Sequence, residues 1–126
     1  MKKMILKDSL YRIKNVDTTA MTCVIGLIAD SVIYKAHFPG HPVTPGVCIV
    51  AVASELLADM LVCDVELVSV SNAKFLAVID PCSCGDVTYS FRKVSEDPDS
   101  GAVKVSVDVS GSGVLYSRLS LVYRKS

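Results

Sequence analysis

Residues 45–60 read PGVCIVAVASELLADM, and the rest of the chain is best understood outward from this segment. Proline suits the first position of a helix, where its missing N–H is no loss, and Thr44 before it is a good N-cap. Every residue from Val47 to Ala53 is apolar. β-branched residues would also suit a strand, but the length, the cap and the later polar positions favour a helix. The pattern predicts a helix over Pro45–Met60 that is buried on all sides.

The segments on both sides of this helix have the composition of strands and turns. Leu10–Ile28 predicts a hairpin broken at Asn15-Val16-Asp17, and Asp30–Thr44 predicts a loop. The later apolar and alternating runs predict four strands: Val65–Ile79 with a bulge near Asn72, Val87–Ser95, Val103–Val109 and Val114–Arg124. The expected fold class is α+β, an antiparallel sheet of five to seven strands wrapped around one central apolar helix.

Composition and charge exclude several classes of protein. With 126 residues, 51% of them hydrophobic, the chain is expected to form a single domain over residues 1–126. Its 13 basic residues balance 13 acidic ones, so it lacks the basic surface that nucleic-acid binding needs. The longest apolar run is far shorter than the ~20 residues of a membrane helix. We expect a cytoplasmic protein with no nucleic-acid partner and no membrane span.

The cysteines point to packing rather than to metal chemistry. The five are irregularly spaced, and their odd number does not suggest a disulfide framework: Cys23, Cys48, Cys63, Cys82 and Cys84. Cys82 and Cys84 are separated by one residue, which is not the spacing of a zinc site. We expect buried thiols that behave as small hydrophobic side chains, with no metal and no cofactor.

The segment before the helix, HFPGHPVTPGV over residues 37–47, carries the chemistry. Its three prolines fix φ repeatedly, so the loop is expected to be stiff. A stiff loop that leads into a helix can hold an imidazole in one orientation. It can also direct the free amides at the helix start toward a substrate oxygen.

This segment resembles the active-site motif of the 3-hydroxyacyl-(acyl-carrier-protein) dehydratases, hotdog-fold enzymes of bacterial fatty acid synthesis. The shared pattern is His-Phe-Pro-Gly-x-Pro-Val-x-Pro-Gly-Val. A weaker match follows at Asn72-Ala73-Lys74-Phe75 and Gly85-Asp86-Val87, where Lys74 replaces the family's Arg and Cys84 its Pro. The resemblance covers about residues 9–124. It implies a hotdog fold and a dimer that joins two sheets edge to edge.

The resemblance also implies site residues. His37 would be the base that removes a proton next to the thioester, and the Gly46 N–H would polarise the thioester carbonyl. An imidazole with a pKa of about 6.5 and a fixed N–H donor suit these two steps. His41 occupies the variable position of the motif and is expected on the loop surface. Substrate contacts are implied at Phe38, Pro45, Val47, Ala51, Lys74 and Phe75.

The chain departs from the family at the helix acid. The family's acidic residue should lie five positions after Gly46, where this chain has Ala51. Glu55 is the nearest acid, one turn or ~6 Å further along the axis and on about the same face. Glu55 is therefore the candidate substitute. The alternative is that it marks the polar end of a helix emerging from the core.

The leading functional hypothesis is a dehydratase that removes water from 3-hydroxyacyl thioesters of acyl carrier protein. Ala51 keeps two alternatives open. One is a non-catalytic or half-catalytic hotdog subunit that pairs with an intact dehydratase chain. The other is an acyl thioesterase or acyl-binding module. The expected partners are acyl carrier protein and a second hotdog chain, identical or different, in a dimer or a higher oligomer.

Overall fold

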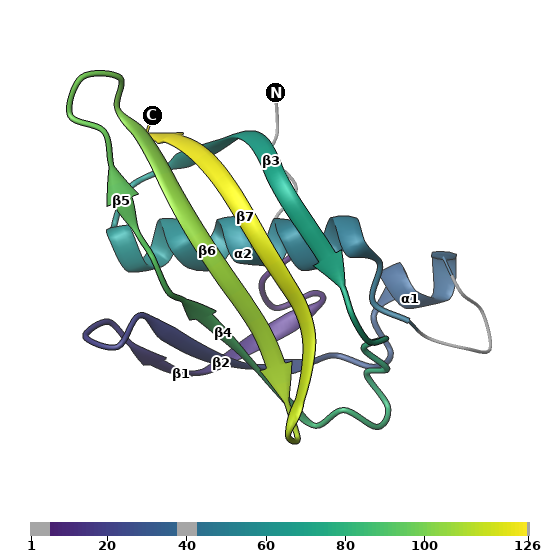
Figure 1. The fold of residues 1–126 in the computed structure, drawn as a ribbon. Helices are drawn as coiled ribbons and strands as arrows, with labels where there is room; N and C mark the ends of the chain where they lie inside the picture. Colours follow the sequence, from purple (N-terminus) through teal and green to yellow (C-terminus); the bar gives the residue numbers. More distant parts are fainter. Residues whose placement is uncertain (1–5, 38–42, 126) are drawn as a thin grey trace.

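The computed structural model describes residues 6–37 and 43–125, of which His37 is described by its backbone alone (Figure 1). The described chain forms one antiparallel sheet and two helices. The helices are α1 (Val32–His37) and α2 (Gly46–Leu61). The strands are β1 (Tyr11–Asp17), β2 (Thr22–Leu27), β3 (Val65–Phe75), β4 (Asp86–Phe91), β5 (Ser95–Glu96), β6 (Ala102–Gly111) and β7 (Val114–Lys125). This confirms the α+β class predicted from the sequence.

The sheet curves around α2, with strand order β1-β2-β4-β6-β7-β3 and the short β5 paired with β6 (Figure 1). Strand alternation puts Val103, Val105, Val107 and Val109 of β6 in the core, as the sequence pattern predicts. A shift in the β3–β7 register between Val70 and Asn72 confirms the predicted bulge. β3 lies at one edge of the sheet. Neither described helix is long and apolar enough to cross a membrane.

Helix α2 begins one residue later than predicted, with Pro45 rather than Thr44 as its N-cap. The Thr44 hydroxyl is engaged elsewhere, in a 2.8 Å hydrogen bond with the Tyr34 hydroxyl. The face packed on the sheet consists of Cys48, Ile49, Val52, Ala53, Leu56 and Leu57. On the opposite face Val47 is 73% exposed. The prediction of burial on all sides is therefore wrong for the single chain, because the sheet covers only one face of α2.

Three further expectations need correction. The segment expected as a loop contains α1, whose start is fixed by Ser31: its hydroxyl accepts a hydrogen bond from the Ile33 N–H at 3.3 Å. The first hairpin turns after Asp17, because the Asp17 carboxylate accepts the amides of Thr19 and Ala20 at 3.0 Å each. Among the thiols, Cys23, Cys48 and Cys84 are buried, whereas Cys82 is exposed.

Strand lengths also differ from prediction in two places. β3 ends at Phe75 rather than at Ile79, and the chain then continues without regular structure. The strand predicted over Val87–Ser95 is divided into β4 and β5. The end of β3 at Phe75 places that aromatic ring beside the start of α2.

Candidate functional site

A groove of about 450 Å³ runs between the uncovered face of α2 and β3. Its walls are mostly apolar, and charged groups gather toward the later turns of α2 and the start of β3. The lining residues are Lys7, Val47, Val50, Ala51, Ser54, Glu55, Ala58, Asp59, Asp64, Val65, Glu66 and Leu67. An apolar channel with a few polar groups suits an acyl chain that carries one reactive end.

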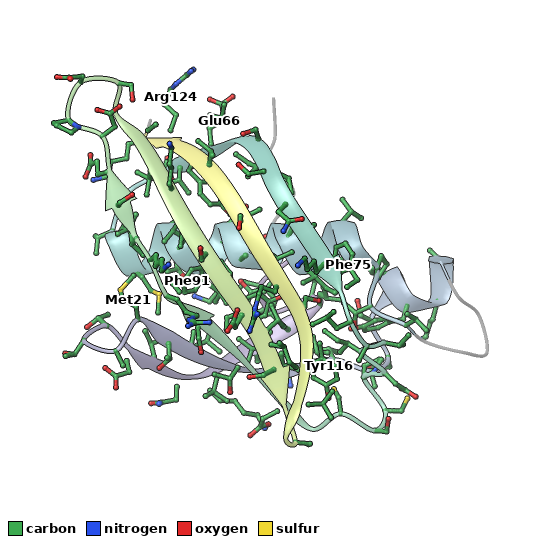
Figure 2. The ribbon with its side chains drawn as sticks, in the orientation of Figure 1. Met21, Glu66, Phe75, Phe91, Tyr116 and Arg124 are labelled. Carbon is green, nitrogen blue, oxygen red and sulfur yellow. The ribbon has the colours of Figure 1, made fainter. Side chains whose placement is uncertain are left out.

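The first turn of α2 lies under the ring of Phe75 at the end of β3 (Figure 2). A Cβ added to Gly46 would lie 2.9 Å from Phe75 Cζ. The absence of a side chain at Gly46 therefore allows the ring to approach the helix this closely. The first amides of a helix have no intrahelical acceptor. Within the described residues the Gly46 N–H has none. This amide can therefore donate to a substrate oxygen at the positive end of the helix dipole.

The backbone of His37 ends α1, and α2 begins at Gly46. Hydrogen bonds fix the described residues on either side of the intervening segment. Tyr34 bonds to Thr44 through their hydroxyls, and the Thr44 N–H donates to the Ile79 carbonyl at 3.0 Å. The fold thus brings the segment that carries His37 to the start of α2. The His37 side chain, Phe38 and His41 lie outside the described residues, so their predicted roles stay predictions.

Burial keeps the nearby ionisable groups protonated at neutral pH. It raises the pKa of the Tyr34 phenol to about 12, against a smaller opposing effect of the Thr44 hydrogen bond. Burial also raises the pKa of the Cys48 thiol, which lies in the first turn of α2. Cys48 is therefore not the activated thiolate that a covalent thioester reaction would need.

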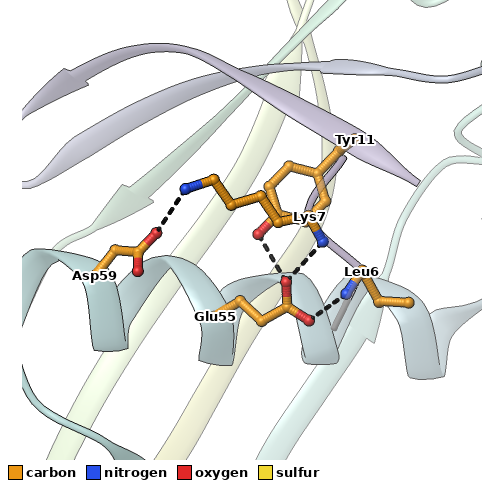
Figure 3. A network of polar contacts seen from close by, with 5 residues as sticks. All are labelled: Leu6, Lys7, Tyr11, Glu55 and Asp59. Carbon is orange, nitrogen blue, oxygen red and sulfur yellow. Dashed lines mark hydrogen bonds and ion pairs between the residues drawn. The ribbon is translucent and has the colours of Figure 1, made fainter. Parts of the chain in front are cut away.

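Ala51 faces the groove, so the position at which the resemblance implies an acid presents only a methyl group. Glu55 also lines the groove, but its carboxylate is already engaged (Figure 3). It accepts the Leu6 N–H at 2.7 Å, the Lys7 N–H at 3.0 Å and the Tyr11 hydroxyl at 2.9 Å. In this arrangement Glu55 ties the N-terminal segment to α2.

The remaining predicted site residues are divided between the groove and the opposite face of the sheet. Val47 lines the groove, and Pro45 is half-buried at the start of α2. Lys74 is not brought to the groove. It lies opposite Arg118 of β7, on the outer face of the sheet, whereas Phe75 next to it is on the helix side.

Sequence reasoning missed the polar contacts that reach α2 from distant strands. The Ser54 hydroxyl, which lines the groove, lies 3.0 Å from the Tyr123 hydroxyl. Glu55 and its partner Tyr11 are 44 residues apart in the chain. A buried tyrosine needs a partner for its hydroxyl, which is the only signal that the sequence offers for such contacts. It does not say which residue the partner is.

Comparison with solved structures identifies the fold. The chain is similar to the dehydratase heterocomplex ApeI:P of Xenorhabdus doucetiae, with 16% identity, 94% of this chain and 99% of that chain covered, and a TM-score of 0.60. It is also similar to a phenylacetic acid degradation-related protein of Ralstonia eutropha described as a thioesterase, with 15% identity, coverages of 92% and 84%, and a TM-score of 0.61. A Streptococcus mutans protein bound to acetyl-CoA matches with 10% identity, coverages of 99% and 94%, and a TM-score of 0.65. The chain has the hotdog fold.

The family follows from the sequence itself. The profile of the ApeI-like family, whose description is ApeI dehydratase, matches residues 13–108. The chain therefore belongs to the ApeI-like dehydratase family. A comparison with curated proteins gave no significant match. Family membership agrees with the predicted hotdog dehydratase class, but it leaves the acyl carrier and the substrate open.

Proposed function

We propose that this protein removes water from 3-hydroxyacyl thioesters of acyl carrier protein. The observation that carries the proposal is the Gly46 amide, which starts α2 at the end of an apolar groove and has no acceptor in the described part of the chain. The loop motif from His37 supports the assignment, and a hydrogen bond between Tyr34 of α1 and Thr44 keeps the residues on its two sides close together.

The reaction divides into two proton transfers. His37 would take the proton from the carbon next to the thioester, and the Gly46 N–H would stabilise the negative charge on the thioester oxygen. Loss of the 3-hydroxyl as water then gives the 2-enoyl thioester. That step needs a proton, and position 51 offers none. A general acid typically contributes ~10²–10⁴-fold, so we expect slow dehydration by the chain alone.

The test is the purified chain with a 3-hydroxyacyl thioester of acyl carrier protein, with the 2-enoyl product measured by mass spectrometry. His37→Ala should abolish product formation, whereas His41→Ala in the same loop is the matched control and should retain it. Ala51→Glu should raise the rate by ~10²-fold or more, because it restores an acid to the groove. A wild-type chain that forms no enoyl product, alone or with Ala51→Glu, would show that the proposed reaction is wrong.

Ala51 also favours a second candidate, a subunit that contributes His37 to a site completed by a different hotdog chain. The similar structure from Xenorhabdus doucetiae is a dehydratase heterocomplex, ApeI:P, which supports this alternative. It predicts that the chain alone is inactive even at high concentration. Addition of a hotdog chain with an acid at the position matching Ala51 should then produce activity that still depends on His37.

A further inference from the structure

A hollow of about 250 Å³ lies on the outer face of the sheet. Figure 1 shows β6 and β7 in front of α2, so this face is turned toward the viewer. Val105 of β6 is buried, so its neighbours Lys104 and Ser106 project outward, away from α2. The hollow and the groove are therefore on opposite sides of the sheet. The lining residues are Ser71, Lys93, Ser95, Lys104, Val105, Ser106, Ser120, Leu121 and Val122.

Serines from neighbouring strands meet at the centre of this hollow. Ser106 of β6 lies directly opposite Ser120 of β7, and Ser95 of β5 lies opposite Lys104 of β6. Opposite residues in an antiparallel ladder share a face of the sheet, so their side chains lie side by side. Serine is not among the residues that strands favour, and its small side chain leaves space that a valine or tyrosine would fill.

Two irregular segments complete the hollow. The β3–β7 register shifts between Val70 and Asn72, which leaves Ser71 without an opposite residue in β7. A bulge of this kind changes the direction of a side chain, and Ser71 lines the hollow. Lys93 comes from the connection between β4 and β5. The hollow is thus formed where regular strand pairing is interrupted on both sides of the β6–β7 pair.

The polar side chains of the hollow are available to a ligand. None of its four serine hydroxyls forms a hydrogen bond with another residue in the described part of the chain. Among the same residues, neither Lys93 nor Lys104 has an ion-pair partner within 4.0 Å. Two ammonium groups and four hydroxyls therefore border one hollow that no acidic side chain lines.

The acids of the neighbouring strands are already paired with other cations. Glu96 of β5 accepts a hydrogen bond from Lys125 at 3.0 Å. Asp108 of β6 accepts one from Arg92 at 3.0 Å and one from Arg118 at 3.3 Å. These pairs neutralise charges on the same outer face, but they leave the two lysines of the hollow without a close counter-charge.

This set of donors suits a phosphate group. A phosphate monoester carries close to two negative charges near neutral pH and presents three strong acceptor oxygens. Lysine ammonium groups bind phosphate as point charges, and serine hydroxyls can donate to the remaining oxygens. A carboxylate has one charge and two oxygens, so it would use fewer of the donors that converge here.

We propose that the hollow binds a phosphate group, either free or carried by a small molecule. Lys93 and Lys104 supply the positive charge, and Ser106 and Ser120 supply hydroxyl donors between them. This site goes beyond the proposed reaction and does not depend on it, because the sheet separates the hollow from the groove and from the Gly46 amide.

Backbone amide resonances of the ¹⁵N-labelled full chain locate the site. Inorganic phosphate is titrated into the protein, with acetate at the same pH and ionic strength as the control. Phosphate should cause saturable shifts at Ser106, Ser120 and their neighbours, and acetate should not. Shifts confined to Gly46 and the first turn of α2 would place the anion at the helix start instead and would overturn the proposal. Equal effects of phosphate and acetate would overturn it too.

Charge removal tests the role of the lysines. The double variant Lys93→Gln, Lys104→Gln should bind phosphate about 10-fold more weakly or worse, since each lysine contributes a charge-assisted hydrogen bond. The double variant Lys14→Gln, Lys35→Gln removes the same charge from β1 and α1 and is the matched control. Its phosphate affinity should be nearly unchanged. An equal loss in both variants would show a general attraction to the protein and no site at the hollow.

Ser106→Val tests whether the hollow itself is required. It fills the space and removes one hydroxyl, keeps both lysines and suits a strand. Phosphate affinity should again fall about 10-fold, with urea unfolding to confirm that the variant is folded. Ser106→Ala with Ser120→Ala removes two hydroxyls without adding volume and should weaken binding if the larger side chain disrupts the strand. Wild-type affinity in a folded serine variant would overturn the proposal.

A comparison of two phosphates distinguishes the sources of the ligand. Glycerol 3-phosphate that binds at least about 10-fold more tightly than inorganic phosphate would assign the site to a phosphorylated small molecule. Equal affinities would assign it to the phosphate group alone. If neither produces saturable shifts at the hollow, the proposal is wrong. These measurements follow binding rather than turnover, so their outcome is independent of whether the chain forms an enoyl product.

Discussion

At the scale of single residues, Glu55 combines two possible roles that make opposite predictions. Its carboxylate accepts two backbone amides and one phenol, all from the N-terminal segment and β1. An ionised carboxylate has only acceptors to offer, and each of these contacts needs one. The same side chain is also the nearest acid to Ala51 along α2. Substitution of Glu55 therefore distinguishes a structural role, the contact with the N-terminal segment, from a catalytic role as proton donor.

Glu55→Gln should destabilise the fold and leave catalysis by the folded protein unchanged. The glutamine amide keeps one acceptor oxygen, but its NH₂ group would face N–H or O–H groups that also donate. The loss should lower the free energy of unfolding by about 1–3 kcal/mol. Urea unfolding and enoyl formation measure the two effects separately. Asp59→Asn is the control, because the exposed Asp59 meets Lys7 only at 3.8 Å and should be nearly silent. A rate loss of ~10²-fold or more at unchanged stability would assign the acid role to Glu55.

Gly46 and Phe75 should show coupled effects on stability. Gly46→Ala forces a Cβ to 2.9 Å from the Phe75 ring, so the ring has to move and the free energy of unfolding should fall. In a Phe75→Ala background the clash is gone, and alanine's better helix propensity should instead stabilise the protein by up to about 1 kcal/mol. Urea unfolding of the two single variants and the double variant measures the coupling. Additive effects would contradict the close contact.

At the scale of elements, α2 ends on an unfavourable residue. Val62 is its C-cap and adopts the left-handed conformation with φ 54° and ψ 41°, which a β-branched side chain resists. Val62 is also 88% exposed, so its side chain contributes little packing. Val62→Gly should therefore raise the free energy of unfolding by about 1 kcal/mol. Val47→Gly, an exposed valine inside the same helix, should instead lower it, by roughly 0.5 kcal/mol.

The elements that could be predicted are those whose signal is periodic and local. The apolar run of residues 47–53 predicted both ends of α2 to within one residue, and the alternating valines predicted β6. Helix α1 was missed because six residues are too few to show a helical repeat. The exposed face of α2 was missed because an apolar face indicates burial without saying whether the same chain provides the cover. The contacts of Glu55 join residues more than 40 positions apart, which no local pattern encodes.

At the scale of the whole molecule, four tyrosines connect α2 and the residue before its cap to the surrounding elements. The Tyr89 hydroxyl donates to the Ile49 carbonyl at 3.0 Å. The Tyr34 hydroxyl forms a hydrogen bond with Thr44, and the Tyr123 hydroxyl forms one with Ser54. The Tyr11 hydroxyl donates to Glu55. The core contains no tryptophan, so these rings supply its largest buried side chains. Each ring fills space in the core, while its hydroxyl fixes the position of α2 along the sheet.

These tyrosines predict that stability falls steeply at alkaline pH. Burial raises the pKa of Tyr34 and of Tyr123 to about 12, and it raises those of Tyr11 and Tyr89 as well. In the unfolded chain a tyrosine loses its proton near pH 10, whereas in the folded chain it keeps it. The folded state therefore binds more protons above pH 10. The free energy of unfolding falls there with rising pH, by at most about 1.4 kcal/mol per unit for each tyrosine, and these groups cause no change below that pH.

Tyr34→Phe separates this proton linkage from the loss of a hydrogen bond. At pH 8 the variant should be less stable by about 1 kcal/mol, because the Thr44 hydroxyl loses its buried partner. Between pH 10 and 12 its stability should decline less steeply than that of the wild type, since one of the raised pKa values is gone. The two curves should therefore converge as the pH rises. Urea unfolding at pH 8, 10 and 11 measures this, and parallel curves would show that Tyr34 does not contribute to the alkaline loss of stability.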